Sequence, residues 1–476
     1  MNQRTPRRFA DWPLRRLAIS TAAATSMCLA LLLSGCAGWT PADWKLPGVV
    51  PAAARRHSPA DIAGYGLTRF SAPIASAEGA HQARAAAMAL VARAAAGGAD
   101  DATVADALRA VAFYDTEVDT GRQVLQAVLI DPVRPLFTRS VDFQRAVLTA
   151  AFALDAASSA PAIEPMLERL ATPREFAIAA YTLRRADSGA AQRERLRAAL
   201  ARRSDPGDPR LVALARALDA DAAFAAGVLP PARPPLADLF AAPFKPGLPV
   251  VYSLQRHDRR QMGLAIVREA DGRFARKPDG TLFAIPQLAL ALSGLPGTIT
   301  LGNTPQGIFT VVGSGTAENA WIGPTPFLES KVPKEATPSE FAHEPIAGDW
   351  TEARYTAWLP PSWRNHRPMQ EAWLAGLAGR DEMLLHGNAV DTTPYRARPW
   401  FPGAPTDGCL MAQESWSPAG RLLSSDQLAL ARVFTRGGSD RGHLVVVEID
   451  DGATPVTLTD VLAAIAAAEA RLAVPR

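Results

Sequence analysis

Cysteine is scarce in this sequence: it occurs three times in 476 residues, at positions 28, 36 and 409. Cys28 and Cys36 fall in an N-terminal stretch with the features of a targeting segment, described below. Cys409 is therefore expected to have no disulfide partner within the chain. An unpaired thiol in an exported protein indicates a reactive residue or an intermolecular pair, and the alternative is a buried cysteine that acts as a small hydrophobic residue.

The sequence also lacks a metal-binding pattern and a basic character. His343, Glu344 and His366 have no ligand-like spacing, and no His, Cys and Asp cluster resembles a zinc site. The formal net charge is +3, but residues 1–35 alone carry five Arg and one Asp, a net of +4, so a mature chain without them has a charge of about −1. We therefore expect no metal, no cofactor and no nucleic-acid partner.

The uncharged apolar stretch 17–33 is too short to span a membrane comfortably. It follows a basic region with arginines between positions 4 and 16, and it precedes Leu33-Ser34-Gly35-Cys36, which resembles a bacterial lipobox. We predict that residues 1–35 are a lipoprotein signal peptide and that Cys36 carries the lipid anchor; a plain signal peptide or an uncleaved anchor are the alternatives. By analogy with Gram-negative sorting, Ala37 favours the outer membrane, facing the periplasm.

The chain then divides by composition. Residues 36–60 are rich in proline and predict a tether. Residues 61–228 are alanine-rich, with apolar residues at helical spacing. Helices are expected at Ala80–Ala96, Asp101–Phe113, Arg122–Leu129, Val141–Ala156 and Arg174–Arg185. The stretches that begin at Ala146 and Glu175 look like two units of a helical-hairpin repeat, which predicts a HEAT-like or TPR-like stack, with an irregular bundle as the alternative. No polar group in this all-α domain suggests chemistry, so we expect a spacer or a surface that docks a protein partner.

Prolines at 230, 231, 234 and 235 predict a Pro-rich linker over residues 229–245. Residues 246–476 then read as a mostly β domain, which makes the fold class multidomain α + β. Strands are expected at Val250–Leu254, Leu264–Arg268, Thr298–Leu301, Gly307–Gly313, Met383–His386 and His443–Ile449, and helices at Pro286–Leu292, Asp426–Arg436 and Leu458–Leu472. Residues 321–380 look like an insertion whose tryptophans either pack in the core or wall a substrate groove.

Two short pieces of this β domain could carry chemistry. His386-Gly387 follows an apolar run, and Gly408-Cys409 forms a glycine turn 23 residues later. A cysteine nucleophile needs a base within hydrogen-bond reach and N–H groups aimed at the developing oxyanion. We therefore expect His386 to act as the base and Cys409 as the nucleophile. A hydrogen-bonded histidine at a strand end is the alternative, and His443 is a second possible partner for the thiol.

These residues resemble the signature of the YkuD-type L,D-transpeptidases, which read His-Gly, a loop, then Ser-(His or Asn)-Gly-Cys. The stretch 304–309, Thr-Pro-Gln-Gly-Ile-Phe, is similar to that family's Thr-Pro-x-Gly-x-Phe. The resemblance covers about residues 250–449. It implies that a peptidoglycan stem peptide acylates Cys409, that the N–H groups of Gly408 and Cys409 bind the oxyanion, and that the Gly387 carbonyl orients the imidazole. Transfer to an amine would crosslink the wall or attach a protein to it, and transfer to water would be hydrolysis.

The sequence departs from that signature at three positions. Thr406 stands in place of serine, Asp407 in place of histidine or asparagine, and Met411 in place of an arginine that the family often has. Arg396 and Arg398 are the nearest substitutes for that carboxylate-binding arginine, and with Thr406 and Asp407 they are the candidate substrate-binding residues. The alternative is that both arginines are solvated residues of the loop. A charge at Asp407 would raise the thiol pKa. An L,D-carboxypeptidase or endopeptidase, or a non-catalytic scaffold that binds peptidoglycan, therefore stays open.

Overall fold

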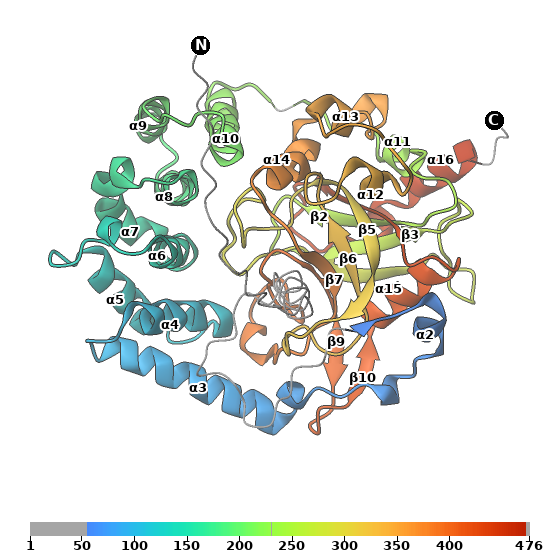
Figure 1. The fold of residues 1–476 in the computed structure, drawn as a ribbon, viewed down its shortest axis with the longest axis horizontal. Helices are drawn as coiled ribbons and strands as arrows, with labels where there is room; N and C mark the ends of the chain where they lie inside the picture. The colour runs from blue at the N-terminus through green and yellow to red at the C-terminus, as the bar shows by residue number, and fades with distance from the viewer. Residues whose placement is uncertain (1–54, 230, 473–476) are drawn as a thin grey trace, which may run out of the picture.

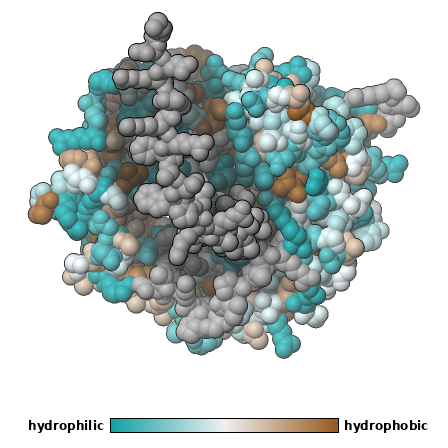
Figure 2. All heavy atoms as spheres, in the orientation of Figure 1, coloured by the Kyte–Doolittle hydropathy of each residue, from teal (hydrophilic) through white to brown (hydrophobic). Residues whose placement is uncertain are grey.

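The structure is a computed structural model that describes residues 55–229 and 231–472. The predicted signal peptide, Cys36 and most of the predicted tether lie outside the described residues. Figure 1 shows a curved array of helices beside a β-rich half. On the face drawn in Figure 2 most of the coloured surface is hydrophilic, with hydrophobic residues in small separate groups. Within the described ranges, no helix has both the length and the apolar composition that crossing a membrane requires.

The helical array is built from eight helices in two layers. Helices α4, α6, α8 and α10 follow one another on the side that faces the β-rich half, and α3, α5, α7 and α9 lie outside them (Figure 1). The bounds are α3 Ala77–Ala95, α4 Asp101–Tyr114, α5 Val118–Leu129, α6 Val141–Leu154, α7 Ala156–Ile163, α8 Pro173–Ala186, α9 Ala190–Ala201 and α10 Pro209–Ala225. All five helices expected from periodicity are confirmed within a few residues. Side-chain oxygens at Ser76, Asp100, Ser140, Asp155 and Thr172 cap their N-termini, as such residues commonly do.

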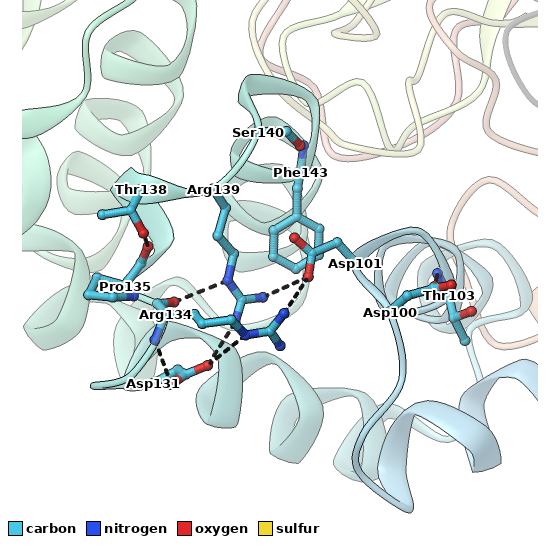
Figure 3. A network of polar contacts seen from close by, with 10 residues as sticks. All are labelled: Asp100, Asp101, Thr103, Asp131, Arg134, Pro135, Thr138, Arg139, Ser140 and Phe143. Atoms are coloured by element: carbon cyan, nitrogen blue, oxygen red, sulfur yellow. Dashed lines mark hydrogen bonds and ion pairs between the residues drawn. The ribbon is translucent and has the colours of Figure 1, made fainter.

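A buried arginine ties neighbouring helices of the array together (Figure 3). Arg139 precedes α6 and donates to Asp101 at the start of α4 (3.2 Å) and to Asp131 after α5 (2.7 Å). Its guanidinium also lies 4.8 Å from the ring centroid of Phe143. One side chain therefore links the ends of three successive helices, α4, α5 and α6.

The β-rich half contains a closed barrel of eight strands. Around the ring the order is β5-β11-β2-β3-β4-β8-β7-β6, and β6 pairs back with β5. The pairs β11–β2 and β7–β8 are parallel and the others antiparallel. The bounds are β2 Val250–Arg256, β3 Gly263–Arg268, β4 Ala284–Leu288, β5 Gly307–Thr316, β6 Phe327–Lys331, β7 Met383–His386, β8 Leu410–Ala412 and β11 Gly442–Asp450. A separate ribbon pairs β9 (Glu414–Trp416) with β10 (Leu422–Ser425).

The described part of the chain begins and ends on the barrel. Strand β1 (Arg55–Arg56) pairs with β5, and helix α2 (Pro59–Gly64) packs on α15 (Asp426–Thr435). The end of the predicted tether is therefore folded, and the part of the expected helical domain before α3 belongs to the barrel. Ile62, Tyr65 and Phe70 are buried in the barrel core. The helical array is thus inserted between two segments of the barrel.

The predicted linker is also shorter than expected. Helix α11 (Leu236–Phe240) lies within it, and its Leu239 and Phe240 are fully buried in the barrel core. The indole Nε1 of Trp363 donates to the carbonyl of Pro235 (3.0 Å). Helix α16 (Leu462–Leu472) packs against α11 at the end of the chain.

Two local predictions in the β domain are wrong. The stretch expected as a helix at Pro286–Leu292 contains β4, because its apolar run is too short for periodicity to separate a strand from a helix. The stretch expected as a strand at Thr298–Leu301 is a series of turns. Ile299 there is fully buried against the helical array instead of the barrel, so its β-branched side chain reflects packing on a helix layer.

The expected insertion at 321–380 contains strand β6 and three short helices, α12 Pro338–Ala342, α13 Glu352–Thr356 and α14 Glu371–Leu377. Trp350, Trp363 and Trp373 are buried in the barrel core. The core interpretation is therefore confirmed for these three tryptophans, whereas Trp321, at the start of the stretch, lines the pocket that Cys409 faces.

Candidate active site

Strand pairing brings the candidate base and nucleophile together. His386 ends β7, and β8 runs parallel to β7, with Leu385 opposite Leu410 and His386 opposite Met411. Cys409 immediately precedes β8, so the loop between the two residues returns the chain to the same barrel edge. The imidazole of His386 and the thiol of Cys409 line the same pocket, and the thiol raises the pKa of the imidazole. The backbone N–H of Leu384 also donates to Cys409 Sγ (3.3 Å).

The backbone fixes the tautomer of the histidine. His386 Nδ1 lies 2.5 Å from the carbonyl oxygen of Gly387. Because a carbonyl oxygen only accepts, Nδ1 carries the proton and Nε2 is the nitrogen that can take another. Burial lowers the pKa of His386, but the hydrogen bond and charge of Cys409 and the bond to the Gly387 carbonyl outweigh it, so the pKa is raised overall. This arrangement suits a base that becomes an imidazolium beside a thiolate.

Glu414 is a site residue that the sequence analysis missed. Its buried carboxylate accepts from the N–H of Asn388 (3.1 Å) and from Ser425 Oγ (2.5 Å). A Cβ on Gly387 would lie 2.3 Å from this carboxylate, so only glycine fits between the two. Burial raises the pKa of Glu414 to about 7. Its charge contributes to the raised pKa of His386.

The two sequence pieces of the resemblance meet directly. Thr304 Oγ1 lies 3.0 Å from the carbonyl oxygen of Gly408 and 3.3 Å from that of Cys409. Thr406 Oγ1 donates to the Cys409 carbonyl (2.9 Å) and accepts from the Gly408 N–H (3.1 Å). The two threonines therefore shape the turn that presents the thiol. The Gly408 N–H, expected to bind the oxyanion, is instead directed to Thr406.

A buried arginine supports the same turn and was also missed. Arg380 donates to the carbonyl oxygens of Gly297 (2.5 Å), Asn303 (2.7 Å) and Gly302 (3.0 Å). Gly408 has a φ of +113°, and a Cβ there would lie 2.1 Å from Arg380 Nη2. A glycine is therefore required at 408 for both its backbone conformation and its contact with the arginine.

Asp407 forms an ion pair with the helical array. Arg109 of α4 donates to its carboxylate (2.6 Å). Arg398 forms a bidentate pair with Asp115 after α4 (2.5 and 2.6 Å), and Arg396 lines none of the three cavities described below. The arginine paired with Asp407 thus comes from the helical array, in place of the two loop arginines that the sequence suggested.

His443 is a core residue. It is fully buried, its Nε2 lies 3.0 Å from the carbonyl oxygen of Phe341, and its ring stacks on Phe244. Burial lowers its pKa to about 3. The thiol partner is therefore His386.

Cys409 faces a small pocket between the barrel and the helical array. The pocket has a volume of about 80 Å³, and its lining includes His386, Asn388 and Asp407 from the barrel half and Arg109 and Phe113 from α4. The ring of Phe113 lies 5.1 Å from that of Trp321.

Cavities of about 520 and 640 Å³ adjoin the Cys409 pocket along the same interface, and all three are lined in part by Leu292. The helical array, in which no chemistry was expected, therefore forms one wall of the site.

Among the residues that the structure describes, no group of three or more His, Cys, Asp and Glu side chains is placed to hold a metal ion. Comparison of the chain with models of protein families, with curated proteins and with solved structures found no match.

Proposed function

We propose that this protein is a cysteine acyltransferase of the L,D-transpeptidase type that acts on peptidoglycan stem peptides. The observation that carries the proposal is the contact of Cys409 with His386, whose Nδ1 is held by the Gly387 carbonyl, at the end of an interdomain groove. The Thr304 contact adds support, because it joins both pieces of the sequence resemblance at the thiol turn.

Acylation begins when His386 Nε2 takes the proton of the Cys409 thiol. The thiolate attacks an amide carbonyl of the stem peptide, a C–S bond forms, and the carbonyl oxygen becomes an oxyanion. When the oxyanion collapses, the C–N bond breaks and the leaving amine takes the proton from His386. The product of this half-reaction is a thioester on Cys409.

Asn388 supplies a donor for the oxyanion in this proposal. Its Nδ2 is buried and hydrogen-bonds to no group in the part of the chain that the structure describes. The Val390 N–H donates to its Oδ1 (2.6 Å), and the indole of Trp416 donates to its carbonyl (2.8 Å). A buried donor without an acceptor costs about 1–3 kcal/mol, so a site that retains one has a use for it. Asn388 lines the Cys409 pocket, where Nδ2 replaces the N–H that Gly408 gives to Thr406.

Deacylation uses the same groups in reverse. An acceptor amine loses its proton to His386 and attacks the thioester, the C–S bond breaks, and the proton returns to the Cys409 sulfur. With water in place of the amine, the product is a trimmed stem peptide, as in an L,D-carboxypeptidase or endopeptidase. An amine on a neighbouring stem gives a crosslink, and one on a protein attaches that protein to the wall.

The ion pair with Arg109 offsets the effect of the Asp407 charge, which alone would raise the pKa of the Cys409 thiol. Opposite charges 2.6 Å apart cancel most of each other's field at the sulfur. The helical array is then part of the enzyme as well as a surface for a protein partner. In the same proposal the chain is a lipoprotein, anchored through Cys36 in the outer membrane and facing the periplasmic peptidoglycan.

The test is an incubation of the full-length, detergent-solubilised protein with purified peptidoglycan, followed by mass analysis of the digested fragments. New crosslinks or protein-linked fragments support transpeptidation, and trimmed stems support the hydrolase. The matched control is Cys409→Ala, which should abolish either product. Intact protein should also gain the mass of the acyl donor on Cys409. If neither an acyl-enzyme nor a product forms, the proposal is wrong and the alternative of a non-catalytic scaffold that binds peptidoglycan is favoured.

A further inference from the structure

A second cavity lies next to the Cys409 pocket and is lined by cationic side chains. It has a volume of about 520 Å³ and shares Leu292 and Pro405 with the Cys409 pocket. Its walls come from the helical array on one side and from barrel loops on the other. The cations that line it are Arg185, Arg259, Arg260, Arg398 and His257. We call it the cationic cavity.

Three of its four arginines are matched by carboxylates of the protein. Each bond joins a guanidinium to one acid: Arg259 to Glu448 (2.9 Å), Arg260 to Asp258 (2.9 Å) and Arg398 to Asp115 (2.5 Å).

Arg185, at the end of α8, has no carboxylate partner among the described residues. Its guanidinium lies 4.7 Å from the ring centroid of Phe152. Burial lowers the pKa of Arg185, and the charge of Arg260 lowers it further, so two like charges face the same space. Four arginines against three carboxylates leave an excess of about one positive charge while His257 is neutral, and His257, which shares Glu448 with Arg259, adds to it when protonated.

A further donor lines the cavity without a partner. The indole Nε1 of Trp400 is buried and hydrogen-bonds to no described group. Arg398 lies 5.9 Å from the Trp400 ring centroid, so the indole stands beside a guanidinium. An acceptor with negative charge would satisfy the indole and the unmatched arginine together.

We propose that the cationic cavity binds a carboxylate of an acidic peptide whose reacting carbonyl lies at Cys409. This inference rests on the proposed function for the identity of the peptide. A planar carboxylate fits the guanidinium fork, which Asp258 and Asp115 already occupy in bidentate form here. A single negative charge also fits the excess of about one positive charge that the arginines provide.

The backbone offers a route from the thiol to the cavity. The N–H of Leu292 donates to the carbonyl of Thr406 (2.7 Å), and Ala291 pairs with Thr406 in a parallel bridge. Residues 290–294 therefore run from the thiol turn into the cationic cavity, whose lining they share. A peptide laid along this segment places its next polar groups near Arg185.

The experiment measures binding without turnover. Full-length protein carrying Cys409→Ala is titrated, in detergent, with a dye-labelled synthetic stem tetrapeptide whose carboxylates are free and with the same peptide in which they are amidated. Arg185→Gln should weaken binding of the free acid about fivefold to tenfold, since a charge-assisted bond is lost. It should leave binding of the amidated peptide unchanged. Arg202→Gln is the matched control, because Arg202 pairs with Glu168 on the exposed surface and lines none of the three cavities.

Several results would overturn the inference. These are an equal loss for both peptides, a similar loss in Arg202→Gln, or no binding of the free acid. If inorganic phosphate displaces the peptide from the protein that retains Arg185, but not from the Arg185→Gln variant, the ligand of the cavity is phosphate. Because no acyl transfer is needed, the proposed function can fail while the cavity still binds its carboxylate. If wild type forms an acyl-enzyme with a peptide whose binding is unaffected by Arg185→Gln, only the assignment of the cavity fails.

Discussion

Replacing Glu414 by glutamine should increase the stability of the protein relative to wild type as the pH rises from 4 to 8. The carboxylate is buried beneath Gly387, and burial raises its pKa from an ordinary 4.5 to about 7. The separation of these two values corresponds to about 3 kcal/mol of free energy. Glutamine has the same shape and stays neutral, so it represents the protonated glutamate at every pH.

The direction follows from proton binding. With a raised pKa, the folded protein binds the Glu414 proton more tightly than the unfolded chain does. Below about pH 4.5 Glu414 is protonated in both the folded and the unfolded protein, so it causes no pH-dependent loss of stability. Between about pH 4.5 and pH 7 the unfolded chain ionises while the folded protein resists ionisation, so stability is lost as pH rises. Above about pH 7 the full loss of about 3 kcal/mol applies to wild type and is absent in Glu414→Gln.

The assay is urea unfolding of wild type and Glu414→Gln at pH 4, 6 and 8, followed by tryptophan fluorescence. Altered hydrogen bonds to Ser425 and Asn388 shift the variant by the same amount at each pH, so the quantity to compare is how the stability difference changes with pH. We expect the variant to gain up to about 3 kcal/mol relative to wild type between pH 4 and pH 8. A difference that is the same at all three pH values, or that grows in favour of wild type, would refute the reasoning.

Two further predictions concern the thiol. Asn388→Leu should slow acylation of Cys409 by p-nitrophenyl acetate by about 10²–10³-fold. Alkylation by iodoacetamide forms no oxyanion and should stay near the wild-type rate. Equal slowing of both reactions would show that Asn388 only supports its loop. Arg109→Ala should leave the charge of Asp407 unbalanced and move the pH midpoint of alkylation up by about 0.5 to 1 unit. Adding Asp407→Asn should restore the midpoint, and a midpoint insensitive to Arg109 would contradict the role given to the ion pair.

Local patterns in the sequence predicted much of the fold. Apolar periodicity and capping residues located the helices of the array, because those signals act within one or two turns. The strand at Met383–His386 is found as predicted, and Thr304 of one short motif contacts Gly408 of the other. The failures at Pro286–Leu292 and Thr298–Leu301 are runs too short for a pattern to decide.

The rest of the site depends on contacts between distant parts of the chain. Arg109 looks like any exposed helical arginine until the array folds over Asp407, which is 298 residues away. Glu414 carries no local sign that it will lie beneath Gly387. The boundaries of the tether and linker were missed for a similar reason: their apolar residues are buried by partners that come much later in the sequence.

The position of β11 has a consequence for how the chain is made. This strand lies between β5 and β2 in the barrel, yet it is synthesised after every other strand of the barrel. A nascent chain that already contains Thr304, His386 and Cys409 still has a gap in its barrel where Gly442–Asp450 belongs. The helical array, built from contacts between neighbours, can fold much earlier. Assembly of the thiol site is therefore coupled to synthesis of β11, so a product truncated before β11 would carry every reacting side chain without the complete barrel that holds them.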